Sequence, residues 1–198
     1  MKIVTLVFTV LISFLAFSIM KSCERADKFS HRLASPDDNI SVKFDLSPEG
    51  NFTYRVAFRG QKVIQASRLG IVREDADFSN HLTLDSVSAI HPVNYEYEML
   101  QGKKRHYNYA GNERCFYLTN SAGLKMDIVF RVSDDGVAFR YIFPEQSNDL
   151  KTVNKEISEF HFAPQTKAFI QPMEAAKSGW CQVNPCYEEY YLQGVLFF

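Results

Sequence analysis

The residues best suited to do chemistry are two pairs of adjacent carboxylates. Asp134-Asp135 lies between two alternating segments, and Glu188-Glu189 is flanked by tyrosines at 187, 190 and 191. Paired carboxylates can cleave glycosidic bonds, and carboxylates among aromatic rings are typical of sugar and calcium sites. Simpler interpretations stay open. In these interpretations Asp134-Asp135 simply forms a turn, and Glu188-Glu189 lies on the outward face of a strand whose aromatic rings point inward.

Histidine and cysteine spacing does not favour a zinc site. Cys181 and Cys186 close a small disulfide loop if the segment turns near Pro185, or they stay two unpaired side chains. Zinc is disfavoured because no second Cys or His pair stands at ligand spacing. The scattered histidines are interpreted as surface or strand residues. They are His31, His81, His91, His106 and His161.

Composition restricts the class of protein. The 198 residues carry 22 Lys plus Arg against 23 Asp plus Glu, so the net charge is −1 and predicts no nucleic-acid partner. An apolar fraction of 46% with 23% charged residues indicates a folded globular chain. No P-loop, nucleophile elbow, zinc-protease or dinucleotide motif occurs, so the catalytic classes that use them are not favoured.

The first 22 residues predict a signal peptide. Met1-Lys2 is a short positive start, and an almost unbroken apolar run follows to Met20. A retained membrane anchor is the alternative, because the run is close to the length that spans a bilayer. We expect a periplasmic or otherwise exported protein. Cys23 is a candidate lipid anchor, although Lys21 occupies a position where a small residue is usual.

Period-two patterns indicate that the remaining chain is all-β. Alternation over 40–46 and 52–58 predicts one hairpin, and alternation over 124–132 and 137–143 predicts another, with Gly136 in its turn at positive φ. Residues 61–64 open a further strand, 82–97 hold two more and 155–162 one more. Residues 23–34 form an extended polar segment. Many short strands without an amphipathic helix predict an antiparallel β-sandwich.

An ordered set of short motifs resembles glycoside hydrolase family 97. The residues that carry this resemblance begin with Ser35 to Asn39 (S-P-D-D-N), Tyr54 to Ile64 around R-G-Q-K, and Ser67 to Gly70 (S-R-L-G). They continue with Asp134 to Tyr141 (D-D-G-V-A-F-R-Y), Phe143-Pro144 and Tyr187-Glu188. Each motif is short, and their order along the chain makes the set specific.

The resemblance implies an exported exo-acting α-glycosidase, an α-glucosidase or α-galactosidase. Such enzymes have an N-terminal β-super-sandwich, a catalytic (β/α)8 barrel and a small C-terminal β-domain. The sandwich packs on the barrel and supplies one glutamate to a calcium beside the active site. That glutamate corresponds to Glu188, with Glu189 as the second choice. The implied partners are an α-glucosyl or α-galactosyl oligosaccharide and the barrel itself.

Length sets this chain apart from a full member of that family. We expect residues 35–198 to be the N-terminal sandwich alone, truncated before the barrel, incomplete at its C-terminal end and inactive without it. Two alternatives are an independent exported sugar-binding or adhesion sandwich without catalysis, and a membrane-anchored structural domain.

Overall fold

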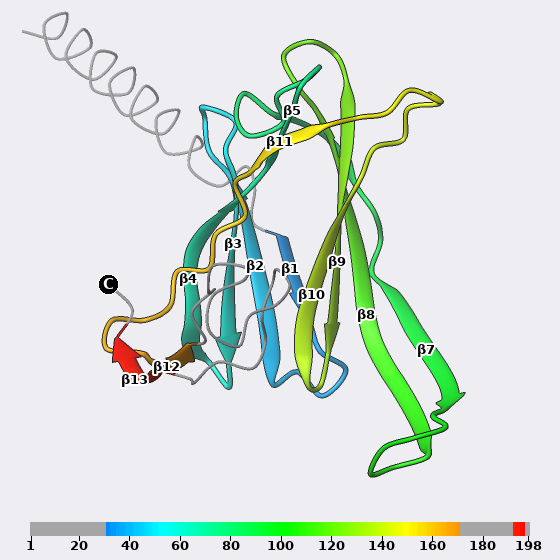
Figure 1. The fold of residues 1–198 in the computed structure, drawn as a ribbon, viewed down its shortest axis with the longest axis vertical. Helices are drawn as coiled ribbons and strands as arrows, with labels where there is room; N and C mark the ends of the chain where they lie inside the picture. The colour runs from blue at the N-terminus through cyan, green and yellow to red at the C-terminus, as the bar shows by residue number, and fades with distance from the viewer. Residues whose placement is uncertain (1–30, 171–191, 197–198) are drawn as a thin grey trace, which may run out of the picture. The chain divides into compact units, whose positions relative to one another are not determined.

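The computed structural model describes residues 31–170 and 192–196, and every regular element in them is a β-strand (Figure 1). The first sheet has four antiparallel strands in the order β1-β2-β3-β4. These strands are β1 His31–Ala34, β2 Ile40–Leu46, β3 Phe52–Phe58 and β4 Gln61–Leu69.

The second sheet has five strands and is organised around β8, whose 14 residues make it the longest strand of the described chain. One side of β8 pairs with β9, and the other pairs with β6 and β7 in succession. β10 then pairs with β9. The bounds are β6 Thr83–Val87, β7 His91–Glu98, β8 His106–Thr119, β9 Lys125–Ser133 and β10 Gly136–Ile142.

Two short ribbons complete the described elements. β5 (Ile71–Arg73) pairs with β11 (Val153–Glu156), and β12 (Lys167–Ile170) pairs with β13 (Leu192–Leu196). Both pairings are antiparallel and contain a register shift.

The two sheets face each other across an aromatic core. The ring of Phe44 on β2 lies 4.4 Å from that of Phe116 on β8 and 4.6 Å from that of Phe130 on β9, measured between centroids. Because strand side chains alternate between faces, alternate residues of β2 and β9 enter the core, together with Phe116 and Leu118 of β8. The fold is therefore the predicted antiparallel β-sandwich. Its fully buried side chains include Leu33, Val42, Phe52, Tyr54, Leu118, Met126 and Ile128.

The turns show where backbone conformation depends on residue type. Arg59 (φ 49°) and Gly60 (φ 80°) form a two-residue turn of the type that matches strand twist. Asp134 and Asp135 make the predicted turn between β9 and β10. The expected positive φ at Gly136 is wrong, because Gly136 is already the first residue of β10 and pairs with Ser133.

Most predicted strands are confirmed, and three segments differ from expectation. Residues 157–162 are not a strand of their own, because β11 ends at Glu156 and only Phe162 forms an isolated bridge, with Ile64. The segment expected to be merely extended contains β1, which is a paired strand. The third difference is β8, which was not predicted. Tyr107 and Tyr109 stand at odd positions, polar residues follow at 112–114, and odd and even positions alike are apolar from Cys115 to Leu118, so no continuous alternation marks the strand.

Candidate functional site

Several predicted functional residues lie outside the described part of the chain. These are the leader, Cys23, Cys181, Cys186, Glu188 and Glu189. Within residues 31–170 and 192–196 no cluster of three potential metal ligands occurs, and no helix is long and apolar enough to span a membrane. Cys115, the cysteine within these ranges, is not in a disulfide, and burial raises the pKa of its thiol.

The first carboxylate pair belongs to a structural contact between two of the motifs. The amide of Asp37 donates a hydrogen bond to Asp134 Oδ1 at 3.0 Å, so the loop before β2 docks on the turn before β10. Asp37 in turn accepts from the Ser35 hydroxyl and from the amide of Asn39. These hydrogen bonds, the one from Ser35 first, lower the pKa of Asp37 to about 2. Asp134-Asp135 therefore forms the turn that the simpler interpretation predicted, and Asp134 also holds the loop before β2 through Asp37, which was not predicted.

The S-R-L-G motif closes one end of the sandwich. The amide of Gly70 donates to Tyr141 Oη on β10 at 3.0 Å, which joins the two sheets at this end. The Arg68 guanidinium donates to Asn51 Oδ1 at 2.9 Å and to the carbonyl of Ser79 at 3.1 Å. Gly70 also lies so close to the 78–79 backbone that an added Cβ would come within 2.7 Å of Ser79 Cα. The glycine of the motif is therefore required because the backbone at residue 70 passes too close to the backbone at 78–79 for any side chain.

Residues 157–162, which we call the seam segment, run along the free edge of β4. The amide of Ile157 donates to the carbonyl of Gly70 at 2.8 Å, and the amide of Glu159 donates to that of Arg68 at 2.9 Å. Further along, the amide of Gln65 donates to the carbonyl of His161 at 2.7 Å. The seam segment therefore covers an edge that would otherwise expose unpaired backbone groups.

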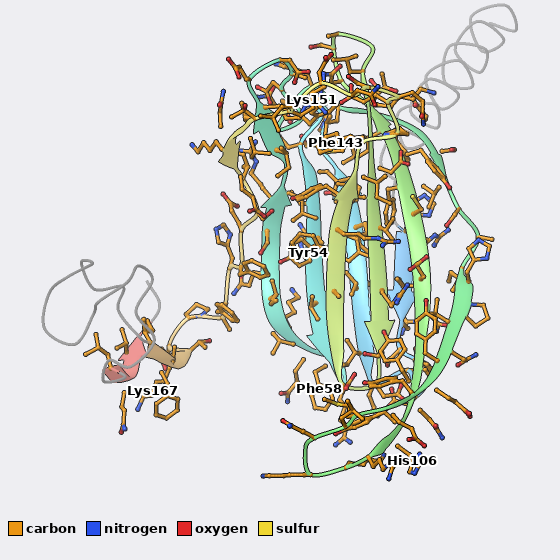
Figure 2. All side chains as sticks on the ribbon, turned by 45° about the vertical axis from the view of Figure 1, so that its right-hand side comes forward. Tyr54, Phe58, His106, Phe143, Lys151 and Lys167 are labelled. Atoms are coloured by element: carbon orange, nitrogen blue, oxygen red, sulfur yellow. The ribbon has the colours of Figure 1, made fainter. Side chains whose placement is uncertain are left out.

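Aromatic side chains hold the seam segment against both sheets. Tyr54, on β3 of the first sheet, donates a hydrogen bond from its Oη to the Glu159 carbonyl at 2.9 Å. The Phe160 ring lies 6.4 Å from that of Tyr54 and 6.1 Å from that of Phe139 on β10. Figure 2 shows Tyr54 at mid-height between the layers. Contacts with Tyr54 and Phe139 therefore fix the position of the seam segment. After it, the chain continues to β12 and residues 171–191.

The seam segment and β12 leave apolar surface exposed. Phe160 keeps 52% and Phe169 keeps 73% of its surface accessible. Val63 on β4 and Phe162 are also exposed large apolar residues. Val63 lies beside the seam segment, because its neighbour Ile64 forms the bridge with Phe162.

A charged cluster stabilises the end of the sandwich near the β5–β11 ribbon. The Arg73 side chain is 1% exposed, and its guanidinium lies 5.4 Å from the Phe78 ring and 4.7 Å from the Phe143 ring. It forms ion pairs with Asp75 and Glu145. Lys151 Nζ lies 2.7 Å from Asp75 Oδ2 and adds a second cation; Figure 2 labels Phe143 and Lys151 at this end. The cluster has the character of a structural clamp.

This clamp predicts a loss of stability in acid. Hydrogen bonds from Arg73, then from Lys151, lower the pKa of Asp75 from 3.8 to about 2. A carboxyl whose pKa is depressed by folding stabilises the folded state above its unfolded pKa, and this contribution is lost as the pH falls through the folded value. We expect the free energy of unfolding to fall between about pH 4 and about pH 2.

Urea unfolding at several pH values measures this effect. The Asp75→Asn variant should be less stable than the parent chain at neutral pH and should converge with it toward about pH 2. A constant difference between the two proteins at every pH would contradict the assignment to Asp75.

A second candidate site is a row of tyrosines on the outer face of the five-stranded sheet, which we call the tyrosine ladder. Tyr95 pairs in register with Tyr109, and Tyr97 pairs with Tyr107. The rings of the first pair lie 6.1 Å apart, and those of the second lie 5.2 Å apart and 8° from parallel. Tyr95 and Tyr97 are about half exposed, at 52% and 49%.

Cations and a glycine frame the tyrosine ladder. Lys104 lies 5.3 Å from the Tyr107 ring, and Arg131, which is paired with Glu113, lies 5.5 Å from the Tyr95 ring. Gly111 makes room for the hydroxyl of Tyr109, which would stand 2.8 Å from a Cβ at that position. Sequence reasoning missed this site. Its signal was the repeated Tyr-x-Tyr spacing in 95–97 and 107–109.

The fold and the motif contacts define a two-sheet antiparallel β-sandwich module. The model of the family described as "Glycosyl-hydrolase 97 N-terminal" matches residues 33–196, and the chain belongs to this family. The expected resemblance is confirmed.

The relatives are much longer proteins. A probable retaining α-galactosidase of Streptomyces bingchenggensis is 38% identical over 126 residues, which are 64% of this chain and 18% of that protein. The crystal structure of a β-arabinopyranosidase superposes with a TM-score of 0.76 at 32% identity, covering 83% of this chain and 26% of that one.

Family 97 enzymes from Pseudoalteromonas sp. strain K8 are also similar. Structures in complex with panose and with acarbose each give a TM-score of 0.65 at 25% identity, covering 72% of this chain and 22% of that one. The chain therefore spans about a quarter or less of the length of each of these relatives.

Proposed function

We propose that this chain is the accessory sandwich of an exported α-glycosidase, that it packs against a catalytic barrel, and that it supplies Glu188 as a calcium ligand. The observation that carries the proposal is the seam segment. Its backbone is held along β4 and its Phe160 ring contacts both sheets. A segment fixed in this way determines where the chain leaves the two sheets in the sequence that leads on to Glu188.

The exposed apolar residues of the seam segment and β12 support docking of a barrel. Phe160, Phe162 and Phe169 would lose contact with water when covered by a second module. Each Å² of apolar surface buried contributes roughly 25 cal/mol, so a few aromatic rings supply several kcal/mol toward docking.

The proposed calcium role needs groups beyond this chain. Calcium takes six to eight oxygen ligands, so a single glutamate binds it weakly. The carboxylates that would cleave the glycosidic bond are proposed to lie on the barrel, as are the determinants of sugar and linkage. By itself the chain should therefore bind calcium weakly and turn over no substrate.

The proposed ligand and location follow from the family and the leader. An α-glucosyl or α-galactosyl oligosaccharide is the proposed substrate of the assembled enzyme. Residues 1–22 are the proposed export signal, with Cys23 as a candidate lipid anchor.

A chimaera tests the role of Glu188. We would replace the sandwich of the S. bingchenggensis relative with this one and assay hydrolysis of p-nitrophenyl α-galactoside. Glu188→Gln should lower kcat/KM by about tenfold or more, because loss even of an outer-shell partner of a metal ligand commonly costs this much. Added calcium should restore part of the loss. Glu189→Gln tests the second choice: it should leave activity and calcium dependence unchanged if Glu188 is the ligand, and a loss confined to Glu189→Gln would assign the ligand to Glu189 instead.

The outcomes that contradict the proposal are distinct. If both glutamine variants keep full activity and calcium dependence, Glu188 is not the ligand. Tight calcium binding by this chain alone in calorimetry would show that the site does not need a barrel. Turnover of p-nitrophenyl α-glucoside or α-galactoside by the chain alone would contradict its inactivity.

The tyrosine ladder favours a second candidate function, an independent sugar-binding sandwich. Exposed aromatic rings can pack against the C–H face of a sugar, and tyrosine adds a hydroxyl that forms hydrogen bonds. In a titration with panose, Tyr97→Ala should weaken binding about fivefold. Tyr117→Ala, an exposed tyrosine elsewhere on β8, should not. Equal affinity of the parent chain and Tyr97→Ala would remove the ladder as a sugar site.

A further inference from the structure

We infer that the outer face of the first sheet carries a binding site for a compact oxyanion, phosphate or sulfate, formed by Lys43, Arg55 and Lys62. The three cations come from three successive strands, β2, β3 and β4. Their side chains line one hollow of about 210 Å³ in the surface. No acidic residue lines it; the other lining residues are Ser41, Val56, Ala57 and Gly60.

Strand register brings the three positive charges together. Lys43 is directly opposite Arg55 in the β2–β3 pairing, and Ala57, two residues after Arg55, is opposite Lys62 in the β3–β4 pairing. Like charges directly opposite each other in a sheet repel and destabilise the pairing. A bound anion would remove this repulsion.

The protein does not neutralise these cations in the described part of the chain. Lys43, Arg55 and Lys62 are exposed, and none of them forms an ion pair there. Asp45, the nearest acid on the same face of β2, is opposite Thr53 and is not among the residues of the hollow. The hollow therefore combines a concave shape with uncompensated positive charge, and both features point to an anionic ligand.

The residue types fit a tetrahedral oxyanion. An arginine guanidinium can donate two parallel hydrogen bonds to phosphate or sulfate oxygens, and lysine ammonium groups contribute mobile point charges. Ser41 also lines the hollow, and its hydroxyl can donate a further hydrogen bond. The volume suits one such group rather than a long polyanion. The group can arrive as a free ion or as an ester on a saccharide, since both present the same oxygens.

Calorimetric titration of the purified chain tests the site. Inorganic phosphate, inorganic sulfate, a glucose phosphate ester and glucose would be compared at low ionic strength, because salt screens exposed charges. We expect saturable binding of the three anions and no binding of glucose. Arg55→Gln should weaken phosphate binding about tenfold, and the triple variant with Lys43→Gln and Lys62→Gln should abolish it. Lys155→Gln removes an exposed lysine on β11 and should bind like the parent chain.

A melting experiment provides a second readout that does not depend on heats of binding. Phosphate should raise the melting temperature of the parent chain and of Lys155→Gln, and should not raise that of the triple variant. Tighter binding of the glucose ester than of phosphate would identify an esterified saccharide as the source, and equal binding would identify the free ion. The inference is overturned if no anion binds saturably, or if the triple variant binds phosphate like the parent chain.

Discussion

Replacing Phe44 by alanine should destabilise the sandwich by about 3–5 kcal/mol, the usual cost of removing a buried phenylalanine ring. Phe44 is 2% exposed and its ring lies between those of Phe116 and Phe130 on the opposite sheet. The loss combines the transfer of apolar surface with the cavity left behind, which a rigid β-sandwich fills poorly.

Urea unfolding followed by far-UV circular dichroism measures this loss. Because domains are stable by only about 5–15 kcal/mol, the Phe44→Ala variant should unfold at a much lower urea concentration. Phe169→Ala is the matched control, since the same ring is removed from a side chain that is 73% exposed. If both variants lost the same stability, the core would not lie between these two sheets.

Replacing Gly70 by alanine should cost about 2–4 kcal/mol. The new Cβ would stand 2.7 Å from Ser79 Cα and 2.9 Å from the Phe78 carbonyl oxygen, so backbone has to move. That movement would also strain two hydrogen bonds of Gly70. Its amide donates to Tyr141 Oη, and its carbonyl accepts from the amide of Ile157.

Gly136→Ala is the matched control for this variant. No heavy atom lies within 4 Å of a Cβ built at Gly136, so the free energy of unfolding of the Gly136→Ala variant should differ from that of the parent chain by no more than about 0.5 kcal/mol. In the proposed chimaera, Gly70→Ala should also lower activity, because Gly70 anchors the start of the seam segment. Comparable stability of the Gly70→Ala and Gly136→Ala variants would show that the crossing at Ser79 tolerates a side chain.

The strands that were predicted share a continuous alternation of apolar and polar residues. In β2, β3 and β9 alternate side chains are buried in the core, in β10 they are half-buried, and this pattern is local enough to be read directly. β8 was missed because it has no continuous alternation: the strand passes from the exposed tyrosine ladder at 107–109 to core positions at Phe116 and Leu118. The position of that change depends on the strands paired with β8, which lie far away in sequence.

The candidate sites likewise divide into features that short motifs predict and features that depend on residues distant in the sequence. The family and the turn role of Asp134-Asp135 could be recognised from short motifs, whereas the contact of Asp134 with Asp37 could not, because 97 residues separate them. The hollow lined by Lys43, Arg55 and Lys62 was missed because each of these residues, in its own strand, is an ordinary solvent-facing position. Glu188 lies outside the described residues, and its role remains a proposal.

By itself, the sequence determined the all-β class, the main hairpins and the family, because alternation and short motifs are properties of neighbouring residues. Only the tertiary structure decided which motifs meet, how the seam segment covers the β4 edge, and where cations and tyrosines gather. Pairing register and sheet packing join residues that are distant along the chain, and no local pattern contains that information.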